Sequence, residues 1–217
     1  MWTERLETPV EIISIGDELL SGYTVNSNAA FIGRELLAVG LPVRYVTTVG
    51  DSMEDMESTF AQALKRAKVV ITTGGLGPTD DDLTRRAIVK LFKRNLVFHE
   101  DIWEEIRARY AARGIEIPPV NQNQALLPQG ATIFPNKHGS AVGICLHENG
   151  RWFIALPGVP YEMRQILTEE VIPYLREKVR GAALQVRTLR TTGIAESALA
   201  ELIKPQIKIE PGVKLAY

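Results

Sequence analysis

Short apolar runs alternate with segments of helical spacing in the first part of the chain. The run from Val69 to Ile71 is β-branched and uninterrupted, as expected of a strand buried on both faces, and residues 10–15 and 43–49 predict two earlier strands. After each strand, apolar residues recur every three or four positions, which predicts a helix. The expected inward residues of these helices are Ile32, Leu36 and Val39, then Met56, Phe60, Ala63 and Leu64, then Leu83, Ala87, Ile88, Leu91 and Phe92. This succession predicts an α/β fold with a mostly parallel sheet and helices on both faces.

Beyond Phe92 the pattern no longer repeats this unit. Two apolar runs joined through Asn149 and Gly150 predict a β-hairpin, because Asn-Gly between such runs suits a two-residue turn. The other predicted elements are a helix over residues 100–113, a short polar helix over 121–126, a short strand within 128–139, the hairpin strands 142–146 and 152–156, and a helix that runs through Tyr174.

The composition changes near residues 176–185, which are charged and then small, and we place a domain boundary there. The predicted first domain covers residues 9–175. The second, residues 183–217, is predicted to be the incomplete start of a small α+β domain. It would contain a strand over residues 186–192, a helix over 196–203 and part of a further strand at the end.

Composition and charge exclude several classes of protein. The chain has 217 residues, of which 45% are hydrophobic, enough to bury a core. Its net charge is −1 and its pI is about 6.3, so we expect no general electrostatic attraction to nucleic acid or to an anionic membrane. Cys145 is the only cysteine, so no disulfide can form within the chain. With no apolar signal region and no run long enough to span a bilayer, a cytoplasmic protein is expected.

The stretch from Thr72 to Thr84 carries the most distinctive chemistry. Three glycines and a proline follow the strand, and three aspartates then stand in a row before the next helix. Such a loop lies at the carboxyl end of a strand, where open α/β sheets bind ligands, and glycines let backbone N–H groups approach a phosphate. Because carboxylates repel phosphate, the aspartates favour a divalent cation between the two. The loop is neither a P-loop nor G-x-G-x-x-G.

Polar residues also follow the other predicted strands. Loops 16–22, 50–52 and 74–82 must meet at one end of a parallel sheet, and the turn 157–160 also follows a strand. Clustered carboxylates there can bind a divalent cation, and one of them can orient or deprotonate a water molecule. The acids gathered in this way are Asp17, Glu18, Asp51, Asp80, Asp81 and Asp82.

Each of these residues also has a purely structural interpretation. Thr79 and Asp82 have the spacing of a helix capping box, and so do Ser52 and Asp55. Asp17 and Glu18 can cap the helix that follows them, and the turn at residues 157–160 can simply be rigid. Asn26 and Asn28 can bind a ligand hydroxyl or base, or cap a helix. Arg85 and Arg86 are expected to pair with carboxylates or to face solvent.

A series of motifs carries a resemblance to a known family. In chain order they are Gly16-Asp17-Glu18-Leu19-Leu20, Asn26-Ser27-Asn28, Thr48-Val49-Gly50-Asp51, Thr73-Gly74-Gly75-Leu76-Gly77-Pro78-Thr79, Asp81-Asp82-Leu83-Thr84 and Leu156-Pro157-Gly158-Val159-Pro160-Tyr161-Glu162-Met163. Together they resemble the N-terminal domain of CinA, the competence/damage-inducible protein family. That domain is related to the molybdopterin-binding fold of MogA, MoaB and MoeA. The resemblance covers about residues 9–175, and residues 190–202 resemble the start of CinA's second small domain.

The resemblance implies a three-layer α/β/α domain and a homodimer. In CinA this domain is associated with metal-dependent hydrolysis of the pyrophosphate of ADP-ribose, which gives AMP and ribose 5-phosphate. The nicotinamide mononucleotide deamidase activity of CinA belongs to a separate C-terminal domain, so deamidation is not expected of this chain.

The resemblance also implies roles for individual residues. Asp82 matches a functional aspartate of the MogA-like relatives, and Asp51 matches a second one, so these two are the candidate catalytic residues. Asp81 stands where those relatives have arginine, a departure shared with CinA that favours a metal site over molybdopterin chemistry. The candidate metal ligands are Asp17, Glu18 and Asp81, for Mg²⁺, Mn²⁺ or Co²⁺. The candidate substrate-binding residues are Gly74, Gly75, Gly77, Thr79, Asn26, Asn28, Pro157 and Gly158.

Three functions therefore compete. The first is a metal-dependent pyrophosphatase that acts on ADP-ribose or a similar nucleotide. The second is molybdopterin binding or adenylyl transfer, which would use the same pocket. In the third, the chain is a non-catalytic nucleotide-binding or oligomerisation module, and its acids only cap helices.

Overall fold

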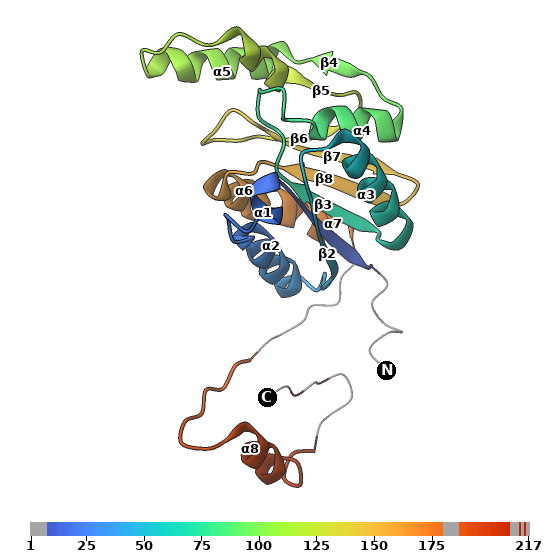
Figure 1. Cartoon of the computed structure of the whole chain (residues 1–217), viewed down its shortest axis with the longest axis vertical. Coiled ribbons are helices and arrows are strands. Elements are labelled where there is room, and N and C mark those ends of the chain that lie inside the picture. Colours follow the sequence, from blue (N-terminus) through green and yellow to red (C-terminus); the bar gives the residue numbers. More distant parts are fainter. Residues whose placement is uncertain (1–7, 180–186, 209–212, 214, 216–217) are drawn as a thin grey trace. The chain divides into compact units, whose positions relative to one another are not determined.

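The computed structural model describes residues 8–179, 187–208, 213 and 215. The chain divides into two units, Met1–Leu184 and Gln185–Tyr217 (Figure 1). The first unit contains the central sheet and its covering helices, and it holds every candidate site residue. The predicted start of the second domain at residue 183 lies outside the described residues.

A six-stranded sheet forms the centre of the first unit, in the order β2-β1-β3-β8-β7-β6 (Figure 1). β1 pairs in parallel with β2 and β3, and β3 pairs in parallel with β8. β7 is antiparallel to β8 and β6 is antiparallel to β7, so the predicted mostly parallel sheet is confirmed. The strands are β1 (Val10–Ile15), β2 (Val43–Val49), β3 (Val69–Thr73), β6 (Thr132–Phe134), β7 (Gly143–Glu148) and β8 (Arg151–Leu156).

Two hydrophobic cores, one on each face of the sheet, make the domain three-layered. One core joins Phe60 and Ile88 of the helices to Phe153 of β8. The other joins Ile32 and Leu36 to Ile71 of β3. Helices α3 (Met53–Arg66) and α4 (Thr84–Phe92) cover the first face, and α2 (Ser27–Ala38), α6 (Pro160–Ile166) and α7 (Ile172–Lys178) cover the second. α6 and α7 are joined by a π-helical turn, η2 (Leu167–Val171), and the short α1 (Asp17–Leu20) follows β1.

The β7–β8 hairpin turns at the residues that the sequence singles out. Asn149 has φ 51° and Gly150 has φ 72°. Two successive positive φ angles are the requirement of a type I′ turn, which matches the twist of the two strands. The Asn-Gly pair therefore fixes the register in which Glu148 faces Arg151.

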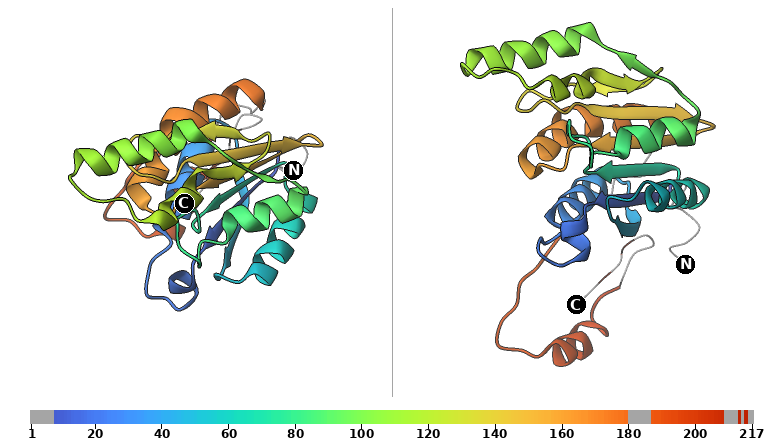
Figure 2. Two further views of the ribbon diagram at one scale, coloured as in Figure 1. Left: turned by 90° about the horizontal axis from the view of Figure 1, so that it is seen from above. Right: turned by 45° about the horizontal axis from the view of Figure 1, so that its top comes forward.

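The segment between α4 and β6 forms an arm beside the sheet (Figure 2). A two-stranded ribbon, β4 (Leu96–Phe98) and β5 (Leu126–Pro128), frames α5 (Glu100–Ala112) and the 3-10 helix η1 (Pro119–Ala125). The side-chain amide of Asn123 in η1 donates to the carbonyl of Pro78, at 3.2 Å. The arm thereby contacts the glycine loop, a contact that the sequence pattern did not predict.

The second unit agrees with the sequence only in part. The predicted helix is present as α8 (Glu196–Ile203), but residues 187–192 form no strand in the structure, although a strand was predicted over 186–192. Residues 187–192 are all exposed. A strand needs a neighbouring strand and an apolar face to bury; the described part of this unit contains no strand, and its helix α8 has no buried residue. In the part of the chain that the structure describes, no helix is long and apolar enough to span a membrane.

We expect the single cysteine to be chemically inert in the folded protein. Cys145 lies in β7 and is 1% exposed. Burial raises the pKa of its thiol to about 12, against an ordinary value of about 8.5, although a hydrogen bond with Tyr174 lowers it. The native protein should therefore react with Ellman's reagent about a thousandfold more slowly than the guanidinium-unfolded chain. Fast reaction of the native protein would contradict the buried position.

Candidate active site

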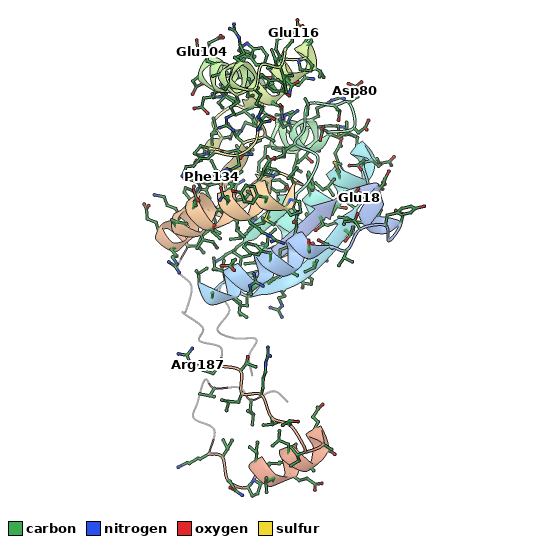
Figure 3. All side chains as sticks on the ribbon, turned by 90° about the vertical axis from the view of Figure 1, so that its left-hand side faces the viewer. Glu18, Asp80, Glu104, Glu116, Phe134 and Arg187 are labelled. Atoms are coloured by element: carbon green, nitrogen blue, oxygen red, sulfur yellow. The ribbon has the colours of Figure 1, made fainter. Side chains whose placement is uncertain are left out.

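Four loops meet at the carboxyl ends of parallel strands. They follow β1, β2, β3 and β8, which run side by side in the sheet. The sequence predicted that the first three loops would meet, and the parallel pairing of β3 with β8 adds the fourth. They lie on the left of the sheet in Figure 1, the side that faces the viewer in Figure 3. The short connections therefore bring together side chains that are far apart in the sequence.

Asp17 and Asp51 are joined by a pair of reciprocal hydrogen bonds. The backbone N–H of Asp17 donates to Oδ2 of Asp51, and the backbone N–H of Asp51 donates to Oδ1 of Asp17, each at 3.1 Å. These reciprocal bonds tie the β1 and β2 loops together. Ser52, not Asp51, caps α3 through the N–H of Asp55. Each of the two carboxylates keeps one oxygen that accepts no hydrogen bond from the described residues.

The electrostatics of Asp51 show how strongly negative charge gathers here. Burial raises the pKa of Asp51 above its ordinary value, and the charges of Asp17, Glu18 and Asp82 raise it further. The hydrogen bond from the Asp17 N–H lowers it in part. The repulsion among these carboxylates favours a bound cation or proton at this place.

Asp82 holds the glycine loop in shape. Its Oδ1 accepts from the N–H of Gly77 at 2.7 Å, and its Oδ2 accepts from the N–H and the hydroxyl of Thr79, at 2.9 and 2.6 Å. The predicted capping box is not present, because α4 begins at Thr84 and its N-cap is Leu83. The hydrogen bonds between Thr79 and Asp82 close a loop ahead of the helix instead.

Two glycines of this loop are required by close contacts. Gly74 has φ 115°, and a Cβ added there would lie 2.4 Å from the carbonyl oxygen of Ile15. A Cβ on Gly77 would lie 2.4 Å from Oδ2 of Asp82. At position 74 a side chain would collide with the backbone of β1, and at position 77 it would collide with the carboxylate of Asp82, which closes the loop.

Behind the glycine loop, the first turn of α4 supplies side chains that bind its carbonyls. The hydroxyl of Thr84 donates to the carbonyl of Gly74 at 2.9 Å, and Arg85 donates to the carbonyls of Leu76 and Gly77 at 2.5 and 2.8 Å. Arg85 is 6% exposed, which contradicts the expectation that it would pair with a carboxylate or face solvent. Burial lowers the pKa of Arg85, and the charge of Asp82 opposes this. The burial of Arg85 could have been predicted from its position, because Arg85 stands three residues before the buried Ile88 on the same helix.

Asn26 and Asn28 have different roles. Asn26 caps α2, since its Oδ1 accepts from the N–H of Ala29 and from the hydroxyl of Ser14, both at 3.1 Å. The Nδ2 of Asn28 donates to Oγ1 of Thr73 at 3.1 Å and to the carbonyl of Gly158 at 2.9 Å. The Oδ1 of Asn28 is buried and has no partner among the described residues. Asn28 is thus the better candidate for ligand contact.

A pocket of about 200 Å³ opens beside Asn28. Its walls come from the end of β1, the loop that leads to α2, Thr73 of β3 and the turn after β8. Gly158 lies in close contact with the glycine loop, since a Cβ on it would meet the Cα of Gly74 at 3.4 Å. Pro157 takes part through its carbonyl, which accepts from the hydroxyl of Thr73 at 2.8 Å. Of the two predicted residues after β8, Gly158 lines the same space as Asn28 and Glu18, whereas Pro157 does not line it.

Other predicted acids are not gathered in this way. Asp80 and Asp81 are exposed, and in Figure 3 Asp80 lies well away from Glu18. Within residues 8–179, 187–208, 213 and 215, no three His, Cys, Asp or Glu side chains are arranged to hold a metal ion. The predicted ligand set of Asp17, Glu18 and Asp81 is therefore not a preformed group, although Asp17 and Asp51 are in contact.

Comparison with known proteins identifies the family. Residues 11–177 match the model of the probable molybdopterin binding domain. A CinA-like protein of Gemmatimonas aurantiaca is 44% identical over 212 residues, which are 96% of this chain and 50% of that protein. The chain belongs to the CinA-like molybdopterin-binding-domain family. A putative competence-damage inducible protein of Clostridium acetobutylicum is 42% identical over 91% of this CinA-like chain and 48% of its own length. The chain thus spans about half the length of the curated relatives it matches.

Solved structures agree with this assignment. The CinA protein of Thermoplasma acidophilum is 35% identical, with a TM-score of 0.70 over 76% of the CinA-like chain and 98% of its own length. The molybdopterin biosynthesis enzyme MoaB of Thermus thermophilus has a TM-score of 0.53 at 19% identity, over 77% and 91% of the two chains. At that identity the similarity to MoaB shows a shared fold alone.

Proposed function

We propose that this CinA-like domain is a metal-dependent pyrophosphatase that acts on ADP-ribose or a similar nucleotide. Water would add to one phosphorus, the bridging P–O bond would break, and AMP and ribose 5-phosphate would leave as dianions, with release of the two protons of the water molecule. The observation that carries the proposal is the convergence of Asp17, Glu18 and Asp82 on Asp51, whose pKa is raised first by burial and then by these three charges. Such a concentration of negative charge next to a glycine loop suits a cation shared with phosphate oxygens.

The acid pair fits a divalent cation of a particular kind. Mg²⁺ usually binds through one or two carboxylates and takes its remaining ligands from water and substrate phosphates. Asp17 and Asp51 supply two carboxylates, each with one oxygen that accepts no hydrogen bond from the described residues. Two carboxylate ligands suit Mg²⁺, and no group of three His, Cys, Asp or Glu ligands is present in the described residues. Glu18 is the next acid in the cluster. When bound, the cation would neutralise phosphate charge and assist ionisation of water.

The remaining side chains supply binding and orientation. The N–H groups of Gly74 and Gly77 already donate to Leu156 and Asp82, so those of Gly75 and Leu76 would be the ones to face a phosphate. Asp82, Thr84 and Arg85 hold the loop in place. Asn28 presents a buried acceptor to the pocket, which suits a hydroxyl or amino group of a nucleoside. Because Asp17 and Asp51 would each use their remaining oxygen to bind the cation, Glu18 is the acid left to accept a proton from the attacking water.

The test is hydrolysis of ADP-ribose, NAD, FAD and ATP, each with Mg²⁺, Mn²⁺ or Co²⁺ and with chelator. Release of AMP from ADP-ribose that depends on the metal is the expected result. Absence of turnover with every nucleotide and metal would overturn the proposal. Binding of nucleotide without turnover would then favour the non-catalytic module.

Molybdopterin binding is the second candidate, because the family model and the fold shared with MoaB point to it. It would use the same glycine loop and pocket. Tight binding of molybdopterin by a protein that cleaves no pyrophosphate would favour it. The position of Asp81, where the MogA-like relatives have arginine, counts against it.

The two asparagines separate stability from ligand binding. Asn26→Ala should lower the free energy of unfolding by about 1 kcal/mol, because it removes a helix cap. Asn28→Ala should raise the KM for ADP-ribose by about tenfold, through loss of a buried hydrogen-bond partner of the ligand. Urea unfolding and steady-state kinetics on both variants measure the two effects. Equal KM values for Asn26→Ala and Asn28→Ala would remove Asn28 from the substrate site.

We also propose that the protein acts as a homodimer in the cytoplasm, without nucleic acid or membrane partners. The family resemblance supports the dimer, and the net charge of −1 gives no general attraction to nucleic acid or to anionic lipid. Light scattering on the purified chain measures the oligomeric state. A monomer at all accessible concentrations would rule out the dimer.

A further inference from the structure

We propose that a second pocket, at the opposite end of the sheet, binds a small amphipathic anion with an apolar body and one phosphate or carboxylate group. This pocket has a volume of about 450 Å³, within the range of small-molecule sites. It is formed where α3 and α4 end and where the β7–β8 hairpin turns, on the right of Figure 1. β8 begins at this pocket and ends at the candidate active site, so the two sites lie at opposite ends of one strand.

The floor of the pocket is apolar. Leu64, Leu91 and Phe92 line it, and each is only partly buried against the core. The ring of Phe92 packs edge-on against Phe153 of β8, with 5.6 Å between ring centroids. These side chains offer a fixed apolar surface that an aromatic or aliphatic group can cover.

The rim of the pocket is positively charged. Lys65, Lys93 and Arg151 line it, and in the described part of the chain none of the three forms an ion pair. The only lining carboxylate is that of Glu148, which is already paired with Arg94 at 2.9 Å. The pocket therefore presents net positive charge, although the whole chain is slightly acidic.

Arg151 supplies the observation that points to a ligand. Its Nε is buried, and the described residues give it no hydrogen-bond acceptor. A buried donor without a partner is costly, and a guanidinium is the side chain best suited to bind a carboxylate or phosphate in two-point geometry. An anion placed at Arg151 would satisfy this donor, with Lys65 and Lys93 nearby and its apolar body on the floor. Nothing in the proposed pyrophosphatase reaction uses these residues.

The experiment is a titration of the isotopically labelled full chain, followed by the shifts of its amide NMR signals. The probes are phenyl phosphate and benzoate, whose relative affinities identify the preferred head group. Two control compounds each represent one half of the ligand: inorganic phosphate represents the anionic head group, and benzyl alcohol represents the apolar body. We expect saturable shifts at residues 64–65, 91–93 and 149–151 with at least one probe, and binding of either half about tenfold weaker.

Variants make the test specific. Arg151→Gln should weaken binding by about tenfold, since hydrogen bonds to charged groups are worth that much. Lys65→Gln, at an exposed position of α3, should weaken it by about threefold. Arg107→Gln on α5 makes the same change of charge away from the pocket and should leave affinity unchanged. Shifts that do not saturate, shifts centred on the glycine loop, or equal affinities for Arg151→Gln, Lys65→Gln and Arg107→Gln would overturn the proposal.

Discussion

Replacing Asp82 by asparagine is expected to reduce hydrolysis of ADP-ribose by about a hundredfold or more while the protein stays folded. The carboxylate accepts three hydrogen bonds, from the N–H of Gly77 and from the N–H and hydroxyl of Thr79. An asparagine side chain has a single acceptor oxygen, so its amide group must face at least one donor. The glycine loop would lose its closed shape, and the acid cluster would lose one of its charges.

The matched control is Asp80→Asn. Asp80 is exposed and stands in the same run of aspartates, so this variant makes the same change of charge without touching the loop hydrogen bonds. It should retain nearly full turnover. Steady-state kinetics and thermal unfolding on both variants separate loss of activity from loss of structure. A folded Asp82→Asn protein as active as Asp80→Asn would show that this carboxylate is not needed for turnover.

The position of Asp82 illustrates what the sequence could predict about the site. The pattern of strands and helices placed its loop at the carboxyl end of β3, and parallel pairing then brought it to the loops after β1 and β2. The direction in which the carboxylate points could not be predicted, because the Thr79–Asp82 spacing fits both a helix cap and a closed loop. Only the start of α4 at Thr84 decides between them.

Side chains with long-range partners were beyond the sequence pattern. Arg85 stands between Thr84 and Arg86 at the start of α4. Its acceptors are backbone carbonyls of the preceding loop, which residue types do not predict. The contact between Asn123 and Pro78 joins segments that are far apart in the chain. The predicted strand over residues 186–192 shows the opposite error. Its β-branched residues satisfy a local preference, but strand formation depends on a partner.

The buried acid of β1 is the clearest case of a long-range partner that the sequence pattern does not predict. Glu11 is fully buried in a strand that otherwise consists mainly of apolar residues. Its carboxylate accepts from Nε and one terminal nitrogen of Arg66, at 2.8 and 2.6 Å, and from the hydroxyl of Thr47 at 2.7 Å. The guanidinium of Arg66 also lies over the ring of Tyr45, 4.2 Å from its centroid. Three elements, β1, β2 and α3, thus meet at one ion pair.

Removing Arg66 should therefore destabilise the protein far more than removal of an ordinary surface charge. Arg66→Ala leaves a buried carboxylate without its cation, and we expect the free energy of unfolding to fall by about 3 kcal/mol. This is the lower part of the usual range, because the Arg66 side chain is 41% exposed and water can partly replace it. The midpoint of thermal unfolding should fall by about 6–12 °C.

Two further variants decide the cause of that loss. Lys65→Ala, one residue earlier on α3 and without an ion pair among the described residues, should change stability by less than about 0.5 kcal/mol. The double variant Glu11→Leu/Arg66→Met removes both charges and keeps apolar bulk, so it should recover most of the stability that Arg66→Ala loses. If the double variant were as unstable as Arg66→Ala, the contact of the Arg66 guanidinium with the ring of Tyr45 would be the main contribution. Recovery would instead show that Arg66 is needed chiefly because Glu11 is buried.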